Sequence, residues 1–231
     1  MTFDPNGLSA VIFDLDGTMI DSVPDVVGAL NRLLAEEGRR LVSLDEGRLM
    51  VGEGARPLVE RGFIATGSEA GPAALDDLTR RYIANYRAEP VVETIIFPGV
   101  VEVLKLLAKN GVAMGVCTNK PDEMSHLVLE ALGLADYFGA VIGGDALPVK
   151  KPDEGHLNAV VARLNAVAER TIYVGDSITD AQTAHNAGMP FIAVTYGYSR
   201  VVPEDFKAAC LIDSFADLPA ALMVTAKQGA T

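Results

Sequence analysis

Short apolar runs alternate with amphipathic stretches along most of this chain. The runs are rich in β-branched residues, as at residues 10–13, which is typical of buried strands in a parallel sheet. Between them, apolar residues recur at helical spacing, as at Val100, Val103 and Leu107. Strands that alternate with helices form right-handed βαβ units, so the pattern predicts an α/β protein with a parallel sheet covered on both faces. The predicted strands are residues 10–13, 113–117, 140–142, 171–174, 191–194 and 209–212, and the predicted helices are residues 100–107, 124–132, 157–164, 178–187 and 218–224.

Residues 21–92 interrupt this alternation. The pattern there predicts helices at residues 23–34, 44–50, 56–64 and 73–87, separated by glycine-containing turns, and it predicts no strand. We therefore predict an α/β core formed by residues 1–20 and 93–231 and a helical insertion formed by residues 21–92. Both units fall within the usual size of protein domains.

The composition is that of an ordinary globular protein. The chain has 231 residues, 49% of them hydrophobic, which is too apolar for general disorder and sufficient for a sizeable core. The net charge of −12 argues against nucleic acid or an anionic membrane surface as a partner, and no run approaches the roughly 18 apolar residues of a membrane span. The two cysteines make no disulfide framework and the N-terminus has no signal-peptide features, so we expect a cytoplasmic protein.

Polar side chains follow the predicted strands of the core. In open α/β sheets, ligands bind at the carboxyl ends of the strands, so these side chains are expected to meet at one edge. Clustered carboxylates require a cation, and oxygen donors without nearby histidine or cysteine favour Mg²⁺ over transition metals. A metal beside lysine, hydroxyl and amide donors is typical of a phosphate site. The residues are Asp14, Asp16, Thr18, Thr118, Asn119, Lys120, Lys150, Lys151, Asp176, Ser177 and Asp180.

Motifs that the sequence lacks narrow the choice of catalytic nucleophile. There is no Gly-x-x-x-x-Gly-Lys-Ser/Thr loop, so a P-loop nucleotide site is not predicted. There is no serine elbow, and Cys117 lies inside a predicted strand without a plausible histidine partner, so we expect it to be a core residue. A carboxylate remains, and a carboxylate can form an aspartyl-phosphate.

Four segments resemble the motifs of the haloacid dehalogenase-like superfamily of phosphohydrolases. Residues 14–18 (Asp-Leu-Asp-Gly-Thr) resemble the first motif and residues 116–119 (Val-Cys-Thr-Asn) the second. Residues 151–152 (Lys-Pro) resemble the third, and residues 175–180 (Gly-Asp-Ser-Ile-Thr-Asp) the fourth. The motifs occur in order, each at a predicted strand end or one loop beyond it. The resemblance implies a Rossmann-like doubly wound parallel sheet with an inserted helical cap domain.

The resemblance also implies roles in catalysis. Asp14 would attack phosphorus, and Asp16 would protonate the leaving oxygen and then activate water. Thr118 and Asn119 would donate hydrogen bonds to the phosphoryl oxygens. Lys151 would balance the charge on Asp14 and on the phosphoryl group, because a carboxylate that attacks an anion requires such neutralisation.

The implied cofactor is Mg²⁺. Its ligands would be the Asp14 carboxylate, the backbone carbonyl of Asp16 and the Asp176 carboxylate. Asp180 would lie outside this set or bind the ion through water. The presence of Asp16 implies a phosphate-ester enzyme, because dehalogenases and phosphonatases of the superfamily lack a second aspartate at that position.

Within the superfamily, the chain most resembles the phosphoglycolate phosphatase family. The matching segments outside the four motifs are residues 18–25, 51–55, 58–61, 143–145 and 195–198. This resemblance implies hydrolysis of 2-phosphoglycolate, with Gly52, Gly54 and Arg56 of the cap as candidate specificity residues. One departure is residues 153–156 (Asp-Glu-Gly-His), where the family usually has a second proline after Lys-Pro.

Other functions stay open at this point. The alternatives are another small substrate (a sugar phosphate, pyrophosphate or a nucleotide), a phosphomutase of the same fold, and a non-catalytic binding module. The expected partner is a small phosphorylated metabolite, and the chain is expected to be a monomer or a weak homodimer. Lys120, His126 and Arg200 lie near the predicted edge without an implied role, and we expect them to be structural or solvated.

Overall fold

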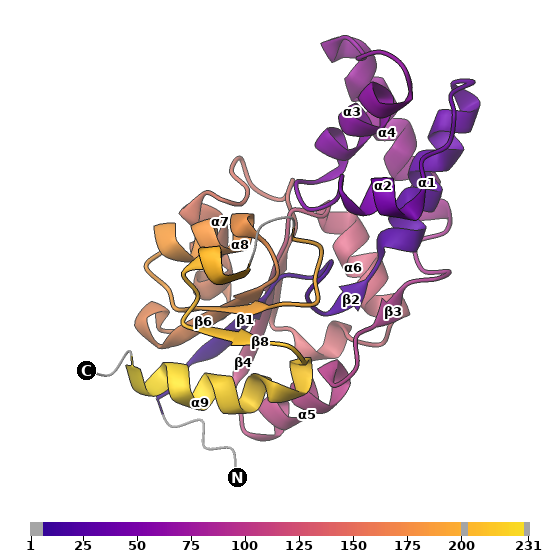
Figure 1. Cartoon of the computed structure of the whole chain (residues 1–231). Helices are drawn as coiled ribbons and strands as arrows, with labels where there is room; N and C mark the ends of the chain where they lie inside the picture. Colours follow the sequence, from indigo (N-terminus) through magenta and orange to yellow (C-terminus); the bar gives the residue numbers. More distant parts are fainter. Residues whose placement is uncertain (1–6, 200–202, 229–231) are drawn as a thin grey trace.

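The core of the computed structural model, which describes residues 7–199 and 203–228, is a sheet of six parallel strands (Figure 1). The strand order is β5-β4-β1-β6-β7-β8, so the chain starts near the centre, builds one half and returns to build the other. Phe13 of β1 lies opposite both Val116 and Val174, which fixes the register of the three central strands. The strands are β1 (Ala10–Phe13), β4 (Ala113–Cys117), β5 (Ala140–Ile142), β6 (Thr171–Gly175), β7 (Phe191–Val194) and β8 (Cys210–Ile212).

The alternation of side chains along each strand divides the core between the two faces of the sheet. In β1, Val11 and Phe13 join one apolar cluster and Ile12 joins the other, and all three are fully buried. The first face is covered by α5, α6 and α9, and the second by α7 and α8. Burial of both faces explains why these strands are continuous apolar runs. The helices are α5 (Val100–Lys109), α6 (Asp122–Ala131), α7 (Glu154–Arg163), α8 (Ile178–Asn186) and α9 (Leu218–Gln228).

Four helices inserted after β1, called the cap below, lie on the opposite side of the molecule from α9 (Figure 1). The long helices α1 and α4 pack against each other, and α3 packs on α4. Their contact is apolar, with Leu30 and Leu33 of α1 and Leu78 and Tyr82 of α4 buried. The helices are α1 (Val23–Glu36), α2 (Leu44–Arg48), α3 (Ala55–Thr66) and α4 (Pro72–Ala88).

Two short strands join the cap to the core. β2 (Ile20–Asp21) pairs antiparallel with β3 (Ile95–Ile96), so the outgoing and returning chains run side by side. Asp25, at the start of α1, holds the returning chain. Its carboxylate accepts hydrogen bonds from the three backbone N–H groups of residues 92–94 and from the Thr94 hydroxyl. The two connections are therefore tied to each other as well as to the cap.

The predicted fold class is confirmed: the chain is an α/β protein with a doubly wound parallel sheet and a helical insertion. The division into residues 1–20 with 93–231 and residues 21–92 stays a prediction. β2 and β3 were not predicted, because two residues are too few for an alternating pattern to be recognised. None of the described helices is both long and apolar enough to cross a membrane.

Candidate active site

Asp14 directly follows β1 and lies at the edge of the sheet that faces the cap. The Asp14 N–H donates to the Val174 carbonyl at 2.9 Å, so pairing between β1 and β6 continues to this residue. A tight turn follows in which Gly17 has a φ of +85°, a region that favours glycine. A Cβ atom at Gly17 would also lie 2.6 Å from Asp176 Oδ2. Glycine therefore lets this turn pass directly beside Asp176.

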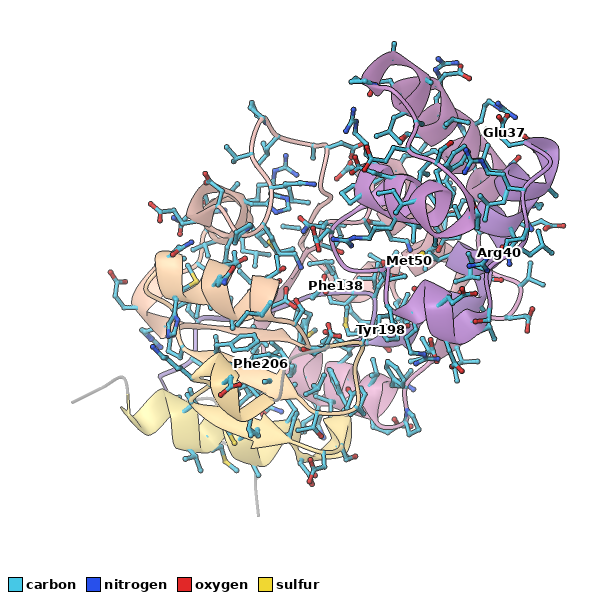
Figure 2. The ribbon with its side chains drawn as sticks, turned by 45° about the horizontal axis from the view of Figure 1, so that its top comes forward. Glu37, Arg40, Met50, Phe138, Tyr198 and Phe206 are labelled. Atoms are coloured by element: carbon cyan, nitrogen blue, oxygen red, sulfur yellow. The ribbon has the colours of Figure 1, made fainter. Side chains whose placement is uncertain are left out.

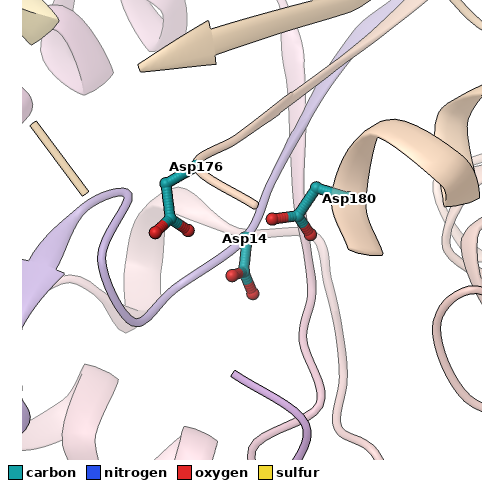
Figure 3. A group of neighbouring side chains, drawn as sticks. All are labelled: Asp14, Asp176 and Asp180. Atoms are coloured by element: carbon teal, nitrogen blue, oxygen red, sulfur yellow. The ribbon is translucent and has the colours of Figure 1, made fainter. Parts of the chain in front are cut away.

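Asp14, which follows β1, and Asp176 and Asp180, at the junction of β6 and α8, bring three buried carboxylates together (Figure 3). One oxygen atom from each lies within 4.8 Å of the others. Burial raises the pKa of Asp14 to about 6, although the nearby Lys151 ammonium acts to lower it. Burial, together with the charges of Asp180 and Asp14, raises the pKa of Asp176 well above its ordinary value. A bound cation would stabilise the ionised carboxylates and so lower these pKa values.

The chemistry of the cluster fits a metal ion. Its donors are carboxylate oxygens, the ligands that hard divalent cations prefer, and no histidine or cysteine among the described residues belongs to it. Asp14 Oδ1 is buried and accepts no hydrogen bond from the described residues. Lys151 Nζ lies 2.8 Å from this oxygen, as an ion pair without hydrogen-bond geometry. One buried oxygen of Asp14 thus has an ion pair but no hydrogen bond, and the cluster can hold a metal ion.

Asp176 is positioned by neighbours that also lead to the cap. The Thr18 hydroxyl donates to its Oδ1 at 3.3 Å, and the Tyr198 N–H donates to its Oδ2 at 2.6 Å. Tyr198 lies where the sheet meets the cap (Figure 2). Its hydroxyl accepts from the Ser22 N–H at 2.9 Å and donates to Asp21 Oδ1 at 2.7 Å. One residue therefore joins the carboxylate cluster to the connection between core and cap.

Lys151 is the buried counter-charge of the cluster. Its side chain is 2% exposed, and Nζ donates to Asp180 Oδ1 at 2.7 Å and to the Tyr173 hydroxyl at 3.1 Å. Burial alone lowers the pKa of a lysine, but the charges of Asp14 and Asp180 outweigh it and hold the pKa of Lys151 above its ordinary value. Asp180 Oδ2 accepts from the Ser177 N–H and hydroxyl in the capping box of α8. The helix thus fixes Asp180, and Asp180 fixes the lysine.

Asp16 faces away from the carboxylate cluster. The Ser22 hydroxyl donates to its Oδ1 at 2.5 Å, and Lys120 Nζ donates to Oδ1 and Oδ2 at 3.0 and 3.2 Å. Lys120 Nζ also donates to the Tyr86 hydroxyl of the cap at 2.8 Å. The two carboxylates of the first motif therefore have different partners: Asp14 pairs with Lys151, and Asp16 pairs with Lys120.

A cavity between core and cap opens onto Asp14 and Asp16. Thr118 and Asn119, at the end of β4, also line it, and both are buried. Asn119 Oδ1 has no hydrogen-bond partner among the described residues. The cap contributes mostly apolar walls to the cavity: Val26, Val51, Gly52, Gly54, Ala55, Leu58, Tyr82 and Tyr86.

Comparison with known proteins identifies the family. Residues 11–194 match the haloacid dehalogenase-like hydrolases. The chain belongs to this family. It is 44% identical over 218 residues to a phosphoglycolate phosphatase of Caulobacter vibrioides, covering 94% of this chain and 92% of that one. A phosphoglycolate phosphatase of Rhodospirillum rubrum is 43% identical, with coverage of 90% and 88%. A solved structure described as "a predicted phosphoglycolate phosphatase" from Haemophilus somnus matches with a TM-score of 0.86 at 27% identity, covering 92% and 96%.

In this haloacid dehalogenase-like hydrolase, most of the residues singled out in the sequence lie together. Their roles in catalysis stay predictions. Gly54 illustrates how closely the cap loop approaches the core: its φ is +96°, and a Cβ atom there would lie 2.9 Å from the Asn119 carbonyl oxygen. The singled-out residues that line the cavity are Asp14, Asp16, Thr118, Asn119, Lys120, Gly52 and Gly54, and Lys151, Asp176 and Asp180 surround Asp14 beyond it.

Arg56 is not brought to the cavity of this hydrolase. Its Nε donates to Asp76 Oδ1 at 3.1 Å, and its side chain is 48% exposed. His126 is likewise exposed, 3.8 Å from Asp122. Arg200 lies outside the described residues. The geometry therefore gives Arg56 no contact with a substrate in the cavity.

Tyr86 is a polar residue of the cavity lining that sequence reasoning missed. Lys120 was predicted to lie near this edge and to be structural or solvated, and its side chain is 2% exposed and bound to Asp16, so it is not solvated. Its position directly after Thr118 and Asn119, in the same strand-end turn, was an available signal. Tyr86 had no such signal, because only the packing of the cap on the core brings α4 to this turn.

The expectation that Cys117 has no histidine partner was wrong. Its Sγ lies 3.5 Å from His156 Nδ1, and both side chains are fully buried. Burial raises the pKa of the Cys117 thiol to about 12 and lowers the pKa of His156. A protonated thiol without access to the cavity is a poor nucleophile. The interpretation of Cys117 as a core residue therefore holds.

Proposed function

We propose that this chain is a Mg²⁺-dependent phosphomonoesterase that hydrolyses 2-phosphoglycolate to glycolate and phosphate through an aspartyl-phosphate on Asp14. The observation that carries the proposal is the pair of carboxylates in one turn with different partners. Both line the cavity, but Asp14 lies beside Lys151 and the acidic cluster, whereas Asp16 pairs with Lys120. The choice of substrate is supported by the relatives named phosphoglycolate phosphatase.

The proposed reaction has two half-reactions. In the first, an Asp14 oxygen forms a bond to phosphorus, the bond from phosphorus to the ester oxygen breaks, and Asp16 gives its proton to the departing oxygen, so that glycolate leaves. In the second, Asp16 takes a proton from water, the water oxygen bonds to phosphorus, and Asp14 leaves as a carboxylate. Phosphate is released, and both aspartates return to their starting states.

Other residues of the chain prepare the attack. Lys151, fixed by Asp180, places a positive charge beside Asp14 and the incoming phosphoryl group. We propose that the Thr118 hydroxyl and the Asn119 side-chain amide donate hydrogen bonds to the phosphoryl oxygens. Fixed donors of this kind stabilise charge that develops in the transition state.

The proposed metal site uses the acidic cluster. The Asp14 and Asp176 carboxylates and the Asp16 backbone carbonyl would hold Mg²⁺, and Asp180 would act mainly through Lys151. The bound ion would neutralise negative charge on the phosphoryl group and on Asp14. The burial of Asp14 and Asp176 supports this assignment, because neither carboxylate has a full complement of positive partners.

The decisive experiment combines a substrate panel with Asp14→Asn. Wild-type enzyme should release phosphate from 2-phosphoglycolate with a higher kcat/KM than from sugar phosphates, pyrophosphate or nucleotides, and only with Mg²⁺ present. Asp14→Asn should retain its fold by circular dichroism and lose turnover. Retained turnover would refute the mechanism, and a preference for another ester would refute the substrate. An isomerised product without free phosphate would instead identify a mutase. Size-exclusion chromatography would test the proposed monomer or weak homodimer.

A further inference from the structure

Lys120 is a buried cation that the reaction described above does not use. Its side chain is 2% exposed, and its ammonium donates to both oxygens of Asp16 and to the Tyr86 hydroxyl. The ammonium also lies 4.7 Å from the centre of the Tyr86 ring. Its backbone is held as well, since its N–H donates to Thr118 Oγ1 and its carbonyl accepts from the Gly144 N–H. The position of this charge is therefore well defined.

Lys120 differs in charge from the other side chains that line the cavity. Among the described residues that line it, Lys120 is the one cationic side chain, and the cap walls beside it are apolar apart from two tyrosines and backbone groups. Lys150 is directed elsewhere, because its ammonium donates to the Glu53 carbonyl on the exposed surface. Lys151 is engaged by Asp14 and Asp180 beyond the cavity wall. For an anionic group of the substrate other than the phosphoryl group, the cationic side chain on this lining is Lys120, which already pairs with Asp16.

We infer that Lys120, together with the Tyr86 hydroxyl, binds the carboxylate of the substrate and thereby determines specificity; this inference rests on the proposed function. In 2-phosphoglycolate the carboxylate carbon is two bonds, of about 1.5 Å each, from the ester oxygen that leaves. That oxygen must lie within hydrogen-bond reach of Asp16, which protonates it. Lys120 Nζ is 3.0 Å from Asp16 Oδ1, so the substrate carboxylate falls within its reach.

The partner groups suit this task. The substrate carboxylate can take the place of one of the contacts that Lys120 makes with Asp16. The Tyr86 hydroxyl accepts from Lys120 and still has its own proton to donate to a carboxylate oxygen. A substrate with an uncharged group at this position would offer Lys120 no carboxylate in exchange for the Asp16 contact that it displaces, which is costly for a buried ammonium.

The test compares two substrates that differ at one group. They are 2-phosphoglycolate and 2-hydroxyethyl phosphate, in which a hydroxymethyl group replaces the carboxylate. Lys120→Met should lower kcat/KM for 2-phosphoglycolate by about 10- to 100-fold more than it lowers kcat/KM for 2-hydroxyethyl phosphate. Because Lys120 also contacts Asp16, Lys120→Met can lower kcat/KM for both substrates. The ratio of the two decreases in kcat/KM cancels this shared effect on Asp16. Lys150→Met is the matched control and should leave the ratio unchanged.

A binding measurement avoids catalysis altogether. In the Asp14→Asn background, calorimetry should show that Lys120→Met weakens binding of 2-phosphoglycolate by about 10- to 100-fold and leaves binding of inorganic phosphate nearly unchanged. If Lys120→Met does not fold, Tyr86→Phe takes its place and should lower the same ratio in the same direction by a smaller factor.

The outcomes separate the two proposals. A wild-type enzyme that prefers 2-phosphoglycolate, with a preference that survives Lys120→Met, would overturn the role of Lys120 and leave the proposed function standing. Equal losses on both substrates would show that Lys120 acts only by positioning Asp16. A wild-type enzyme that hydrolyses both esters equally well would refute both the substrate assignment and the role of Lys120.

Discussion

The core and the cap contribute to the cavity in opposite ways. The core supplies charged groups that are each held by several polar partners: Lys151 contacts Asp14, Asp180 and Tyr173. The cap supplies apolar walls and glycines, and its Tyr86 hydroxyl is held by a lysine of the core. The groups proposed for phosphoryl transfer are thus fixed within the core. The proposed selection of the substrate carboxylate combines Lys120 of the core with Tyr86 of the cap, so it depends on how the two units pack.

Near the cavity, the loop between α2 and α3 of the cap makes few contacts with the core, and these contacts are weak. Asn119 Nδ2 lies 3.4 Å from the Gly52 carbonyl oxygen, a long hydrogen bond. Lys150 Nζ donates to the Glu53 carbonyl at 2.9 Å, but this contact is exposed. Changes at the carboxylate cluster of the core are expected to affect rate and stability strongly, and changes at the contact between Lys120 of the core and Tyr86 of the cap are expected to affect selectivity.

The largest effect is expected from Lys151→Met in the core. The substitution leaves Asp14 and Asp180 buried without their counter-charge, which typically costs about 3–5 kcal/mol of unfolding free energy. Loss of one fixed positive group at the reacting centre should lower kcat by about 10²–10³-fold. Urea unfolding and steady-state kinetics measure the two effects. Lys150→Met, on the exposed neighbour, should change neither, and a kcat within about tenfold of wild type in Lys151→Met would contradict the assignment.

Metal binding tests the same cluster without substrate. Because the buried carboxylates repel one another, Mg²⁺ should raise the Tm of the free enzyme, by the equivalent of about 2.7 kcal/mol at a concentration 100 times the Kd. Asp176→Asn should reduce this rise, because it removes one proposed ligand. Differential scanning fluorimetry with and without Mg²⁺ provides the measurement. A rise of equal size in wild type and Asp176→Asn would place the ion elsewhere.

The difference between core and cap also explains what the sequence could predict. The strand β1, with Asp14 at its end, was predicted correctly because a buried parallel strand is a short apolar run followed by a glycine turn. The doubly wound sheet then placed Asp14 and Asp176 at one edge, as residues that follow parallel strands must be, and the first turn of α8 brings Asp180 beside them. For these residues, local pattern and global position agree.

The cap residues could not be predicted in the same way. Arg56 looked suitable because of its charge and its place in the cap loop, but its side chain is turned toward Asp76. The sequence pattern could not single out Tyr86, because it occupies an apolar position of an amphipathic helix like many others. Its hydroxyl contacts Lys120 only when cap and core pack together. Which side of a helix faces a partner unit depends on tertiary packing, and the periodicity of one sequence does not contain it.

A smaller effect is expected at the connection between the units. Asp25→Asn replaces a carboxylate that accepts from residues 92–94, so it should destabilise the protein by about 1–3 kcal/mol at neutral pH. Burial alone would raise the pKa of Asp25, but its hydrogen bonds from Thr94 and the backbone outweigh burial and lower the pKa. The native carboxylate therefore contributes stability above the pKa of the unfolded chain, and that contribution is lost as the pH falls through the native pKa.

The stability difference between wild type and Asp25→Asn should accordingly shrink as the pH is lowered toward and below the native pKa of Asp25. Denaturant unfolding at a series of pH values measures it. The matched control is Asp45→Asn, which removes an exposed carboxylate at the start of α2 and should give a small difference at every pH. If the difference in unfolding free energy between wild type and Asp25→Asn stays constant down to low pH, the charge of the Asp25 carboxylate does not stabilise the connection between core and cap.

The smallest effect is expected from Arg56→Ala, and it gives the most direct contrast with Lys120→Met. Both are cationic candidates for substrate specificity: Arg56 belongs to the cap and Lys120 to the core. Arg56 pairs with Asp76 at the surface, with side chains 48% and 70% exposed, and such pairs contribute little. Its removal should change kcat/KM for 2-phosphoglycolate by less than about twofold, since exposed ion pairs are worth only a few tenths of a kcal/mol. A loss of selectivity in Arg56→Ala as large as in Lys120→Met would mean that the cap turns Arg56 inward when substrate binds, and that specificity belongs to the cap.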